Sequence, residues 1–443
     1  MSLMARGALW LGLYIGLVAL PLLAGALWPG EMGGRAFGTQ FGVACGFAGL
    51  TILILELALV SEIQAVSSVF GQDALLQFHK QMGMVGTALI ALHAVLVMRG
   101  SYPVEWLNPF SPDSPWAMRW GVVAIVALAL LVGLSLFRRR LGLAYEWWQF
   151  THGLMADLAI AGGLAHIILF AGFSSTTPML ALLTVYGCCA AGLRLWFKVL
   201  RPMRLWAKPW ELVHNVAENA DTHTLVLRPV GHAGFPFEPG QFAWLNTGRT
   251  PFHWDRHPIS MSSAAGDEPG QEIAFTIKEL GDWSAHVVPQ LRPGHRIWVD
   301  GPHGVFTADR EQGPGYVLIG GGSGICPLVS ICHTLALRED VRPVLLFYGA
   351  GDESKMALRG QLQQLAGRLN LQFIPILENP PPTWTGEQGY LTTDILRRHL
   401  PAQYRRFQYF VCGPEAMMDA VEPMLLELGV PVNRIHTERF VMV

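Results

Sequence analysis

The chain has 443 residues, enough for two to four domains, and 51% of them are hydrophobic while only 14% are charged. Its mean hydropathy of +0.34 is too high for an ordinary soluble protein and indicates a large membrane-embedded part. The net charge of −2 argues against a nucleic-acid partner, and the six cysteines include no CxxC pair that would predict a zinc site or a disulfide framework.

Six apolar segments in the first half of the chain are long enough to cross a bilayer, which takes about 17–25 residues each. We predict membrane-spanning helices at Ala8–Trp28, Phe41–Val60, Phe78–Met98, Trp120–Leu136, Phe150–Phe170 and Met179–Leu200. The first segment is longer than the apolar core of a secretory signal, which has about 7–15 residues, and more spans follow it. We therefore expect it to be a retained helix.

The basic residues of the connecting loops predict the orientation, because inner loops are enriched in lysine and arginine. If the N-terminus is inside, the outer loops hold only Arg35, Arg99 and Arg119. The inner loops then hold Arg6, Lys80, Arg138, Arg139, Arg140, Lys198, Arg201, Arg204 and Lys208. This predicts a multi-pass protein of the cell (inner) membrane, with everything after the sixth span in the cytoplasm.

Four histidines lie in these spans, in two pairs of equal spacing. His79 and His93 are 14 residues apart, and so are His152 and His166. Fourteen residues turn a helix by about 1400°, close to four full turns, so each pair lies on one face, about 21 Å apart along the axis. The third and fifth spans run in the same direction, which pairs His79 with His152 near the inner surface and His93 with His166 toward the outer side. This arrangement predicts two stacked b-type haems, each with two histidine ligands.

Other residues in the same spans suggest how such a site is built. Small residues would let a porphyrin approach the helices, and the candidates are Gly83, Gly86, Ala156, Gly162 and Gly163. Glu56 and Asp157 are carboxylates within spans, for which we favour hydrogen bonds between helices over a proton relay. Arg194 could extend to the membrane surface or pair with a haem propionate.

After about residue 205 charges, prolines and turn signals become frequent, and short strands are predicted at Thr224–Leu227, Phe242–Leu245 and Ile273–Ile277. From Tyr316 the pattern is strand, glycine-rich loop, helix and strand, which is typical of a nucleotide-binding α/β domain. We therefore expect three domains, comprising residues 1–204, 205–312 and 313–443.

Five short motifs carry the chemistry of the second half. PGQF begins at Pro239, RHPIS at Arg256 and KELGDWS at Lys278. GGGSGICP begins at Gly320, directly after a strand and before a helix, as a phosphate-binding loop requires, although it departs from GxGxxG. CGP begins at Cys412, after the predicted strand Gln408–Val411.

In this order, the motifs resemble those of prokaryotic-type NADPH oxidases and ferric reductases, members of the ferredoxin-reductase superfamily, over essentially the whole chain. The resemblance implies a six-helix transmembrane haem-binding bundle, an antiparallel β-barrel FAD domain and an α/β NAD(P)H-binding domain. In the FAD domain it assigns FAD binding to the strand His257, Pro258, Ile259 and Ser260, and to a pyrophosphate segment with Lys278, Gly281, Trp283 and Ser284. A cation, a glycine and a hydroxyl near a helix start suit a dianionic pyrophosphate.

In the third domain the resemblance assigns NAD(P)H binding to Gly320, Gly321, Gly322, Ser323, Gly324, Ile325, Pro327, Cys412, Gly413, Pro414 and Glu415. Cys412 would lie close to the path of the hydride, and Phe440 would be the terminal aromatic residue that covers the flavin. NADPH is expected over NADH on the resemblance. Ser354, Lys355 or Arg359 could hold a 2′-phosphate, whereas Asp352 or Glu353 would suit a free 2′-hydroxyl, so NADH stays possible.

The resemblance implies electron transfer from cytosolic NAD(P)H through FAD and two haems to an acceptor on the outer face. We expect O2, reduced to superoxide, and ferric complexes are the alternative acceptor. Several NADPH oxidases carry a second histidine one turn beyond the outer ligand, but here that residue is Val97. A quinone-linked membrane cytochrome is a further alternative. The sequence contains no EF-hand loop, so we expect no calcium switch, and no obligatory protein partner is evident.

Overall fold

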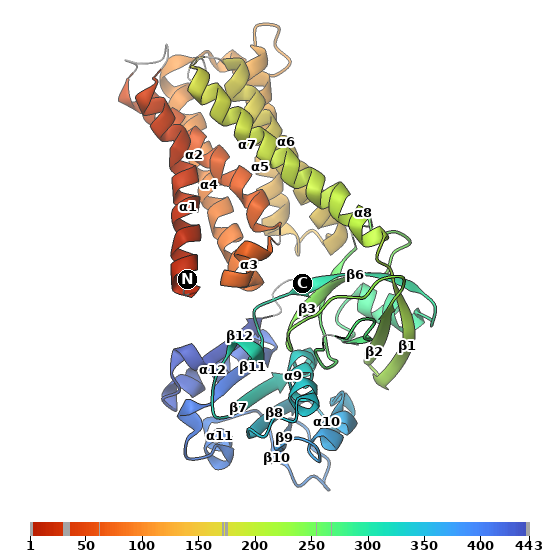
Figure 1. The fold of residues 1–443 in the computed structure, drawn as a ribbon. Coiled ribbons are helices and arrows are strands. Elements are labelled where there is room, and N and C mark those ends of the chain that lie inside the picture. Colours follow the sequence, from red (N-terminus) through yellow and green to blue (C-terminus); the bar gives the residue numbers. More distant parts are fainter. Residues whose placement is uncertain are drawn as a thin grey trace. The chain divides into compact units, whose positions relative to one another are not determined.

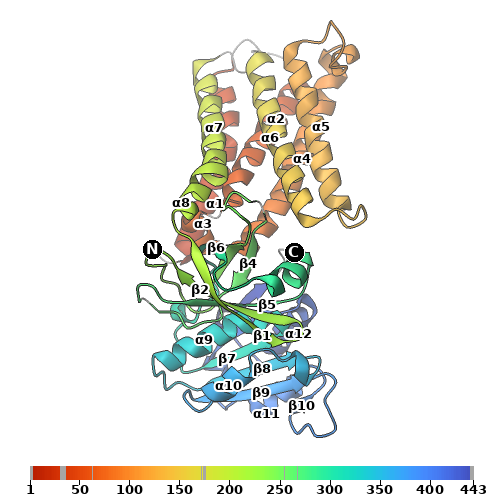
Figure 2. The same cartoon turned by 90° about the vertical axis from the view of Figure 1, so that its right-hand side faces the viewer.

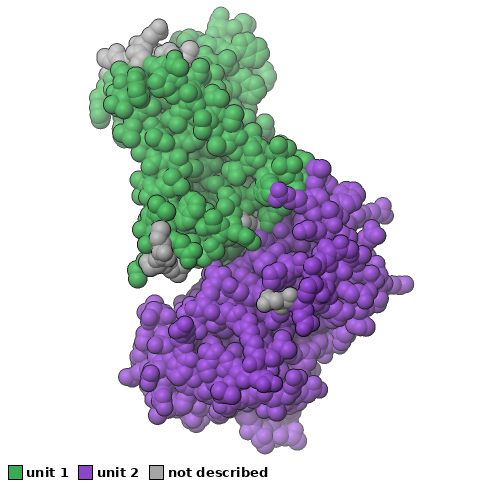
Figure 3. All heavy atoms as spheres, viewed as in Figure 1, with its two compact units in different colours: residues 1–201 green, residues 202–443 purple. Residues whose placement is uncertain are grey.

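The computed structural model describes residues 3–29, 36–61, 63–170, 172, 176–253, 255–266 and 268–439. The chain forms two compact units, Met1–Arg201 and Pro202–Val443, which Figure 3 shows in different colours.

The first unit is helical (Figure 1). Its long helices are α1 (Leu3–Leu27), α2 (Phe37–Leu59), α4 (Gln72–Ser101), α5 (Trp116–Phe137), α6 (Tyr145–Phe170) and α7 (Thr177–Leu195). A π-helical segment (Trp196–Leu200) and α8 (Arg201–Trp206) continue α7, and a short α3 (Gln64–Phe70) that we did not predict precedes α4. In the described residues six helices are long and apolar enough to cross a membrane, and they coincide with the six predicted spans.

The outward faces of these helices are apolar. Large exposed side chains include Leu9, Leu13 and Ile15 on α1 and Val126 and Leu130 on α5. Such surfaces are stable where lipid replaces water. Helix α2 is the most buried of the six, because α4 packs along it and α1, α6 and α7 also contact it.

The two tightest helix pairs are α2 with α4 and α5 with α6, which Figure 2 shows from a second direction. Glycines allow these close approaches. A Cβ added at Gly49 would lie 2.9 Å from the carbonyl oxygen of Gly86, and one at Gly162 would lie 3.1 Å from that of Trp120. Gly86 and Gly162, which we proposed as space for a porphyrin, therefore serve helix packing.

The second unit begins with a six-stranded sheet in the order β4-β3-β6-β1-β2-β5, all antiparallel. The strands are β1 (Trp210–Asn219), β2 (Thr222–Pro229), β3 (Phe242–Asn246), β4 (His257–Ser260), β5 (Ile273–Lys278) and β6 (Arg296–His303). The three predicted strands lie inside β2, β3 and β5. The predicted closed barrel is not observed. Met261, the residue after β4, meets Phe275 of β5 through an isolated bridge.

The second sheet is parallel, in the order β10-β9-β8-β7-β11-β12. The strands are β7 (Tyr316–Gly321), β8 (Val344–Ala350), β9 (Leu371–Leu377), β10 (Glu387–Gln388), β11 (Gln408–Gly413) and β12 (Ile435–Arg439). Its helices are α9 (Ile325–Leu337), α10 (Arg359–Leu365), α11 (Thr393–His399) and α12 (Glu415–Glu427). Buried side chains alternate along β7, so that Leu318 packs with α9 and α10 while Val317 packs with α11 and α12. This confirms the predicted α/β pattern.

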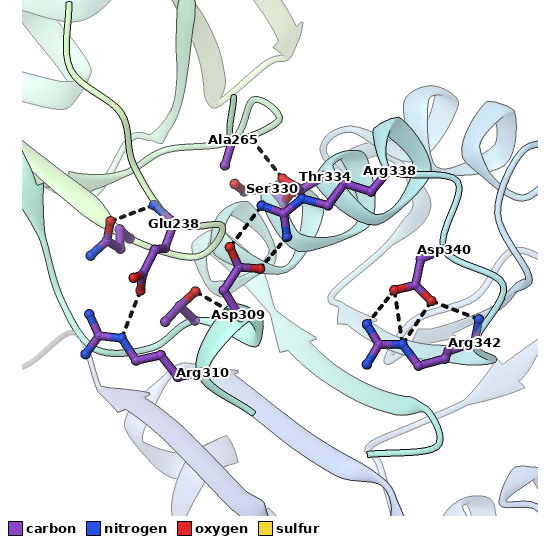
Figure 4. A network of polar contacts seen from close by, with 11 residues as sticks. Glu238, Ala265, Asp309, Arg310, Ser330, Thr334, Arg338, Asp340 and Arg342 are labelled. Atoms are coloured by element: carbon purple, nitrogen blue, oxygen red, sulfur yellow. Dashed lines mark hydrogen bonds and ion pairs between the residues drawn. The ribbon is translucent and has the colours of Figure 1, made fainter. Parts of the chain in front are cut away.

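Helix α9 joins this sheet to the first one. Ser330 Oγ donates to the carbonyl oxygen of Ser263 at 2.8 Å. One turn later, the backbone N–H of Ala265 donates to Thr334 Oγ1 at 2.8 Å. Figure 4 shows both side chains on the face of α9 that meets the segment after β4. This helix therefore fixes the end of β4 relative to the glycine-rich loop that precedes α9.

Charged residues between the two sheets add to this connection (Figure 4). The guanidinium of Arg338, just after α9, donates to both carboxylate oxygens of Asp309, at 2.5 and 2.9 Å. The neighbouring Arg310 donates to Glu238 at 2.9 Å. The segment that links the sheets is thus held at both sides, and the two sheets form one compact unit.

Candidate functional site

The four histidines face one another between α4 and α6 as two pairs. The ring centres of His79 and His152 are 6.2 Å apart, and those of His93 and His166 are also 6.2 Å apart. The structure therefore brings together the same partners that the inferred topology paired.

At the level of His93 and His166, each Nδ1 atom faces a backbone carbonyl of the neighbouring helix. His93 Nδ1 lies 2.9 Å from the carbonyl oxygen of Gly42, and His166 Nδ1 lies 2.8 Å from that of Ala117. A carbonyl only accepts, so Nδ1 must carry the proton in both rings. The Nε2 atoms of the neutral rings then hold a lone pair, which is the state a metal ligand needs.

At the other level the acceptors are side chains. His79 Nδ1 lies 2.5 Å from Glu56 Oε2, and His152 Nδ1 lies 3.1 Å from Ser135 Oγ. The Ser135 hydroxyl donates to the carbonyl oxygen of Leu131 at 2.7 Å, so it can accept from His152. All four Nδ1 atoms are thus engaged, and all four rings present Nε2 for another bond.

The spacing of the rings fits an iron with one imidazole on each side. A ligating nitrogen lies about 2 Å from its metal, and ring bonds of about 1.3 Å put the ring centre about 1 Å farther away, which predicts about 6 Å between centres. In the described residues no cluster of three or more His, Cys, Asp or Glu could hold a metal ion. A haem needs only two protein ligands, because the porphyrin supplies the other four.

Two glycines that sequence reasoning missed make room for the imidazoles. A Cβ added at Gly46 on α2 would lie 2.8 Å from His93 Nδ1, and one at Gly121 on α5 would lie 2.8 Å from His166 Nδ1. Both distances are too short for real atoms, so any side chain here would push the ring away. Glycine is common in membrane helices, so the sequence carries no signal that separates these two from the rest.

An apolar cavity of about 180 Å³, in part open to the exterior, lies beside the His93 and His166 pair. It is lined from α2, α4, α5 and α6, and the lining side chains with polar atoms are Thr39, His93, Tyr102 and His166. Val97 lies on its wall. Its apolar lining with a few polar groups is typical of a cofactor site.

The two intramembrane carboxylates join helices, as predicted. Glu56 on α2 binds His79 on α4 and accepts from Tyr14 Oη on α1 at 3.5 Å. Asp157 on α6 forms an ion pair with Arg194 on α7. Arg194 is held by Asp157 and also donates to the carbonyl oxygen of Gly153 at 3.1 Å, and its pairing with a haem propionate stays a prediction.

In the second unit, β4 carries the predicted flavin-binding residues. The ring of His257 stacks on Trp283, with centres 3.9 Å apart and planes 14° apart, and its Nε2 lies 2.6 Å from Asp255 Oδ1. Burial raises the pKa of Asp255, but the hydrogen bond and charge of His257 outweigh burial and leave the pKa lowered. Ser260 Oγ, at the end of β4, is buried and has no partner among the described residues. A bound ligand could supply that partner.

The predicted pyrophosphate segment is arranged by its own hydroxyl. Ser284 Oγ accepts from the backbone N–H groups of Leu280 and Gly281 at 2.9 and 3.0 Å, so it stabilises the turn. The Gly281 Cα faces open space, since no atom would lie within 4 Å of an added Cβ. Lys278 Nζ lies 3.5 Å from Asp221 Oδ2.

The glycine-rich loop packs directly on the CGP segment. A Cβ at Gly324 would overlap the carbonyl oxygen of Cys412, and one at Gly321 would lie 2.6 Å from Met417 Sδ. Gly322 differs, because its φ is +54° and nothing would lie within 4 Å of an added Cβ. Gly322 is thus the glycine whose backbone a ligand can approach, while its neighbours are needed for close packing.

Other predicted residues of this domain surround the loop. Ser323 is half-buried, and Ile325 and Pro327 are buried in the first turn of α9. Cys412 is fully buried at the end of β11, opposite Gly320 of β7. Glu415 begins α12 and is exposed. Phe440 lies outside the described residues.

A small pocket of about 10 Å³ brings the two sets of predicted residues together. Its lining includes Thr222, Thr276 and Lys278 from the antiparallel sheet, Gly322, Ser323 and Cys326 from the loop and α9, and Tyr348 and Lys355 from β8 and beyond. Two lysines, several hydroxyls and an accessible glycine are groups that bind phosphates. Burial raises the pKa of the Cys326 thiol to about 12, so the thiol is protonated at neutral pH.

Three family descriptions match successive parts of the chain. Residues 45–163 match the ferric reductase like transmembrane component, residues 215–307 match an FAD-binding domain, and residues 318–423 match an oxidoreductase NAD-binding domain. The chain has the NADPH oxidase and ferric reductase type of architecture. The matched descriptions are a transmembrane component, an FAD-binding domain and an oxidoreductase NAD-binding domain, and six described helices are long and apolar enough to cross a membrane.

Curated relatives of this ferric-reductase-type chain include reductases. The reductase component of propane 2-monooxygenase from Mycolicibacterium smegmatis is 30% identical over 228 residues, which cover 50% of this chain and 64% of that protein. Ferredoxin–NADP reductase B from Sorangium cellulosum is 29% identical over 218 residues, which cover 46% of this chain and 86% of that protein. Among solved structures, the FAD/NAD-binding domain of the nitric oxide dioxygenase from Vibrio cholerae aligns with a TM-score of 0.47 at 23% identity, over 53% of this chain and 98% of that one.

Proposed function

We propose that this chain transfers electrons from cytosolic NAD(P)H, through FAD and two bis-histidine b-type haems, to an acceptor on the outer face of the cell (inner) membrane. The observation that carries the proposal is the pair of histidine levels. Each has ring centres 6.2 Å apart, and each ring has its Nδ1 atom engaged and its Nε2 atom available.

The roles of the histidines follow from this geometry. His79 and His152 would ligate the inner haem, and His93 and His166 the outer one. Gly46 and Gly121 clear the space for the outer imidazoles, and carbonyl groups hold their orientation. When bound, FAD accepts two electrons and releases them singly, and each haem carries one electron.

In the cytosolic half we propose an FAD-binding domain of residues 205–312 and an NAD(P)H-binding domain of residues 313–443. Ser260 would hydrogen-bond the flavin, and Lys278 would bind its pyrophosphate. Gly322 would admit a phosphate of NAD(P)H. Buried Cys412 packs against Gly324 of the glycine-rich loop and would lie beside the nicotinamide site. The excess of basic residues in the proposed inner loops supports the cytoplasmic placement of this half.

For the acceptor we propose O2, with superoxide as the product. Among the described residues, the cavity beside His93 and His166 has no charged side chain on its wall. O2 is small and neutral and can approach the edge of a haem held there through apolar surroundings, whereas a charged ferric complex would lose its hydration. Reduction of ferric complexes at the outer surface is the second candidate, because the same electron path would serve it.

The test uses the purified full-length chain with FAD under anaerobic conditions. Adding NADPH should reduce both haems, seen as the ferrous absorption bands. The His152→Leu variant should still oxidise NADPH with an artificial flavin-level acceptor but should not reduce the outer haem. Haems that stay oxidised in the wild-type chain would refute the electron path.

Admitting air then distinguishes the acceptors. Reduction of added cytochrome c should be abolished by superoxide dismutase if superoxide is the product. A dismutase-insensitive signal, together with faster haem oxidation by ferric chelates than by O2, would refute the superoxide proposal and favour iron reduction.

A further inference from the structure

The four histidines share one hydrogen-bond arrangement but differ in the charge of the acceptor. His93 and His166 donate to backbone carbonyls, and His152 faces a serine hydroxyl. His79 alone faces a carboxylate, with Nδ1 2.5 Å from Glu56 Oε2. The carboxylate is 5% exposed, so water does not screen it. The two histidine levels are therefore electrostatically unequal.

The geometry indicates which way the proton of this hydrogen bond lies. If Nε2 of His79 binds iron, the ring proton must be on Nδ1, and Glu56 must be the acceptor. The second oxygen of Glu56 accepts from the hydroxyl of Tyr14 at 3.5 Å. Both oxygens thus face donors, an arrangement that suits a carboxylate.

We propose that Glu56 is a positioning residue that lowers the reduction potential of the inner haem, so that the outer haem is the better electron acceptor of the two. This inference rests on the proposed function. A carboxylate that accepts from Nδ1 makes Nε2 a stronger donor to iron, and its charge in a low-dielectric interior favours the ferric state. The outer histidines have neutral acceptors and receive neither effect.

A potential difference between the two haem levels would favour electron transfer in one direction. Reduction adds one electron, supplied by NAD(P)H through FAD, to ferric iron; no bond breaks and the proton stays on His79 Nδ1. A lower potential at the inner level makes the onward step toward His93 and His166 downhill. Return of the electron from the outer level to the inner one is then uphill.

The test is a spectroelectrochemical titration of full-length protein in its wild-type form and as Glu56→Gln, with low-spin ferric EPR spectra of both. Gln keeps the size and a hydrogen-bond acceptor but has no charge. In Glu56→Gln the ferrous-to-ferric ratio of one haem should rise at least tenfold at a given potential, which is 59 mV for one electron. The EPR signal of the same haem should shift, and the ferrous-to-ferric ratio of the other haem should change less than threefold.

Asp157→Asn is the comparison variant, because it removes another intramembrane carboxylate, whose partner Arg194 acts electrostatically on His152, but leaves the Nδ1 hydrogen bonds of all four histidines in place. It should shift the ferrous-to-ferric ratio of either haem by less than Glu56→Gln does and leave the EPR signals unchanged. Two retained haems with unchanged potentials in Glu56→Gln would overturn the inference. So would an equal shift in Asp157→Asn, because that would indicate a general charge effect.

If Glu56→Gln does not retain both haems, the titration of Tyr14→Phe tests the inference instead. It removes a donor to Glu56 and leaves the carboxylate a stronger acceptor for His79, so the ratio should move in the opposite direction, by at least threefold. An unchanged ferrous-to-ferric ratio in Tyr14→Phe would overturn the inference. A wild-type chain that binds no haem would instead refute the proposed function.

Discussion

Replacing Gly121 by alanine should remove the outer haem and leave the inner one. Gly121 lies on α5 beside His166, and an added Cβ would be 2.8 Å from His166 Nδ1, 3.2 Å from Cε1 and 3.3 Å from Cγ. Carbon atoms in ordinary contact lie about 3.5–4.0 Å apart. The imidazole must therefore retreat by about 0.7 Å or more.

A shift of this size is large for a metal ligand, since functional metal–ligand distances vary by only about 0.2 Å. The movement also breaks the 2.8 Å hydrogen bond from His166 Nδ1 to the carbonyl oxygen of Ala117. Losing such a partner of a ligand typically costs about 10–100-fold in metal affinity. Movement of the ligand itself adds to that loss, so we expect Gly121→Ala to lower the affinity for the outer haem by about 100-fold or more.

The assay is haem content per purified chain, measured by the pyridine haemochrome spectrum, which should fall from two toward one. Gly133→Ala is the control. Gly133 lies on the same helix, and nothing lies within 4 Å of its added Cβ, so both haems should remain. Gly46→Ala, which crowds His93 in the same way, should lose the same haem. Full haem content in Gly121→Ala, with the spectrum of the wild-type chain, would refute the steric argument.

Three further predictions concern the second unit, Pro202–Val443. Ser260→Ala should weaken FAD binding about 5–10-fold in a fluorescence titration, because one hydrogen bond is worth about 1 kcal/mol. Ser262→Ala is the control and should weaken FAD binding less, because the Ser262 hydroxyl already accepts from Thr276 at 2.9 Å. Lys355→Ala should lower kcat/KM for NADPH at least tenfold and for NADH less than twofold; equal losses would contradict a 2′-phosphate role. Burial lowers the pKa of His436 to about 4. Between about pH 6.5 and pH 4 the unfolded histidine binds a proton and the folded one does not, so the protein becomes less stable as the pH falls. His436→Asn should flatten the fall in Tm over that pH range, and an unchanged fall would contradict this account.

The sequence by itself determined the features that belong to a single segment. Length and apolarity predicted six spans, and the helical period placed His79 with His93, and His152 with His166, on one face each. Short apolar runs around a glycine-rich loop predicted the succession of strand, loop, helix and strand from Tyr316 onward. Each of these follows from local spacing, which the order of residues contains directly.

Only the tertiary structure decided what meets what across segments. The acceptors of the histidines, Glu56 among them, come from helices far away in the chain, and Gly46 and Gly121 matter because α2 and α5 pass beside the imidazoles. Gly86 turned out to serve packing, and the antiparallel sheet stayed open where a closed barrel was expected. The physical reason is that a contact between helices depends on their crossing and rotation. Many side chains settle these together by packing, so that no single motif records them.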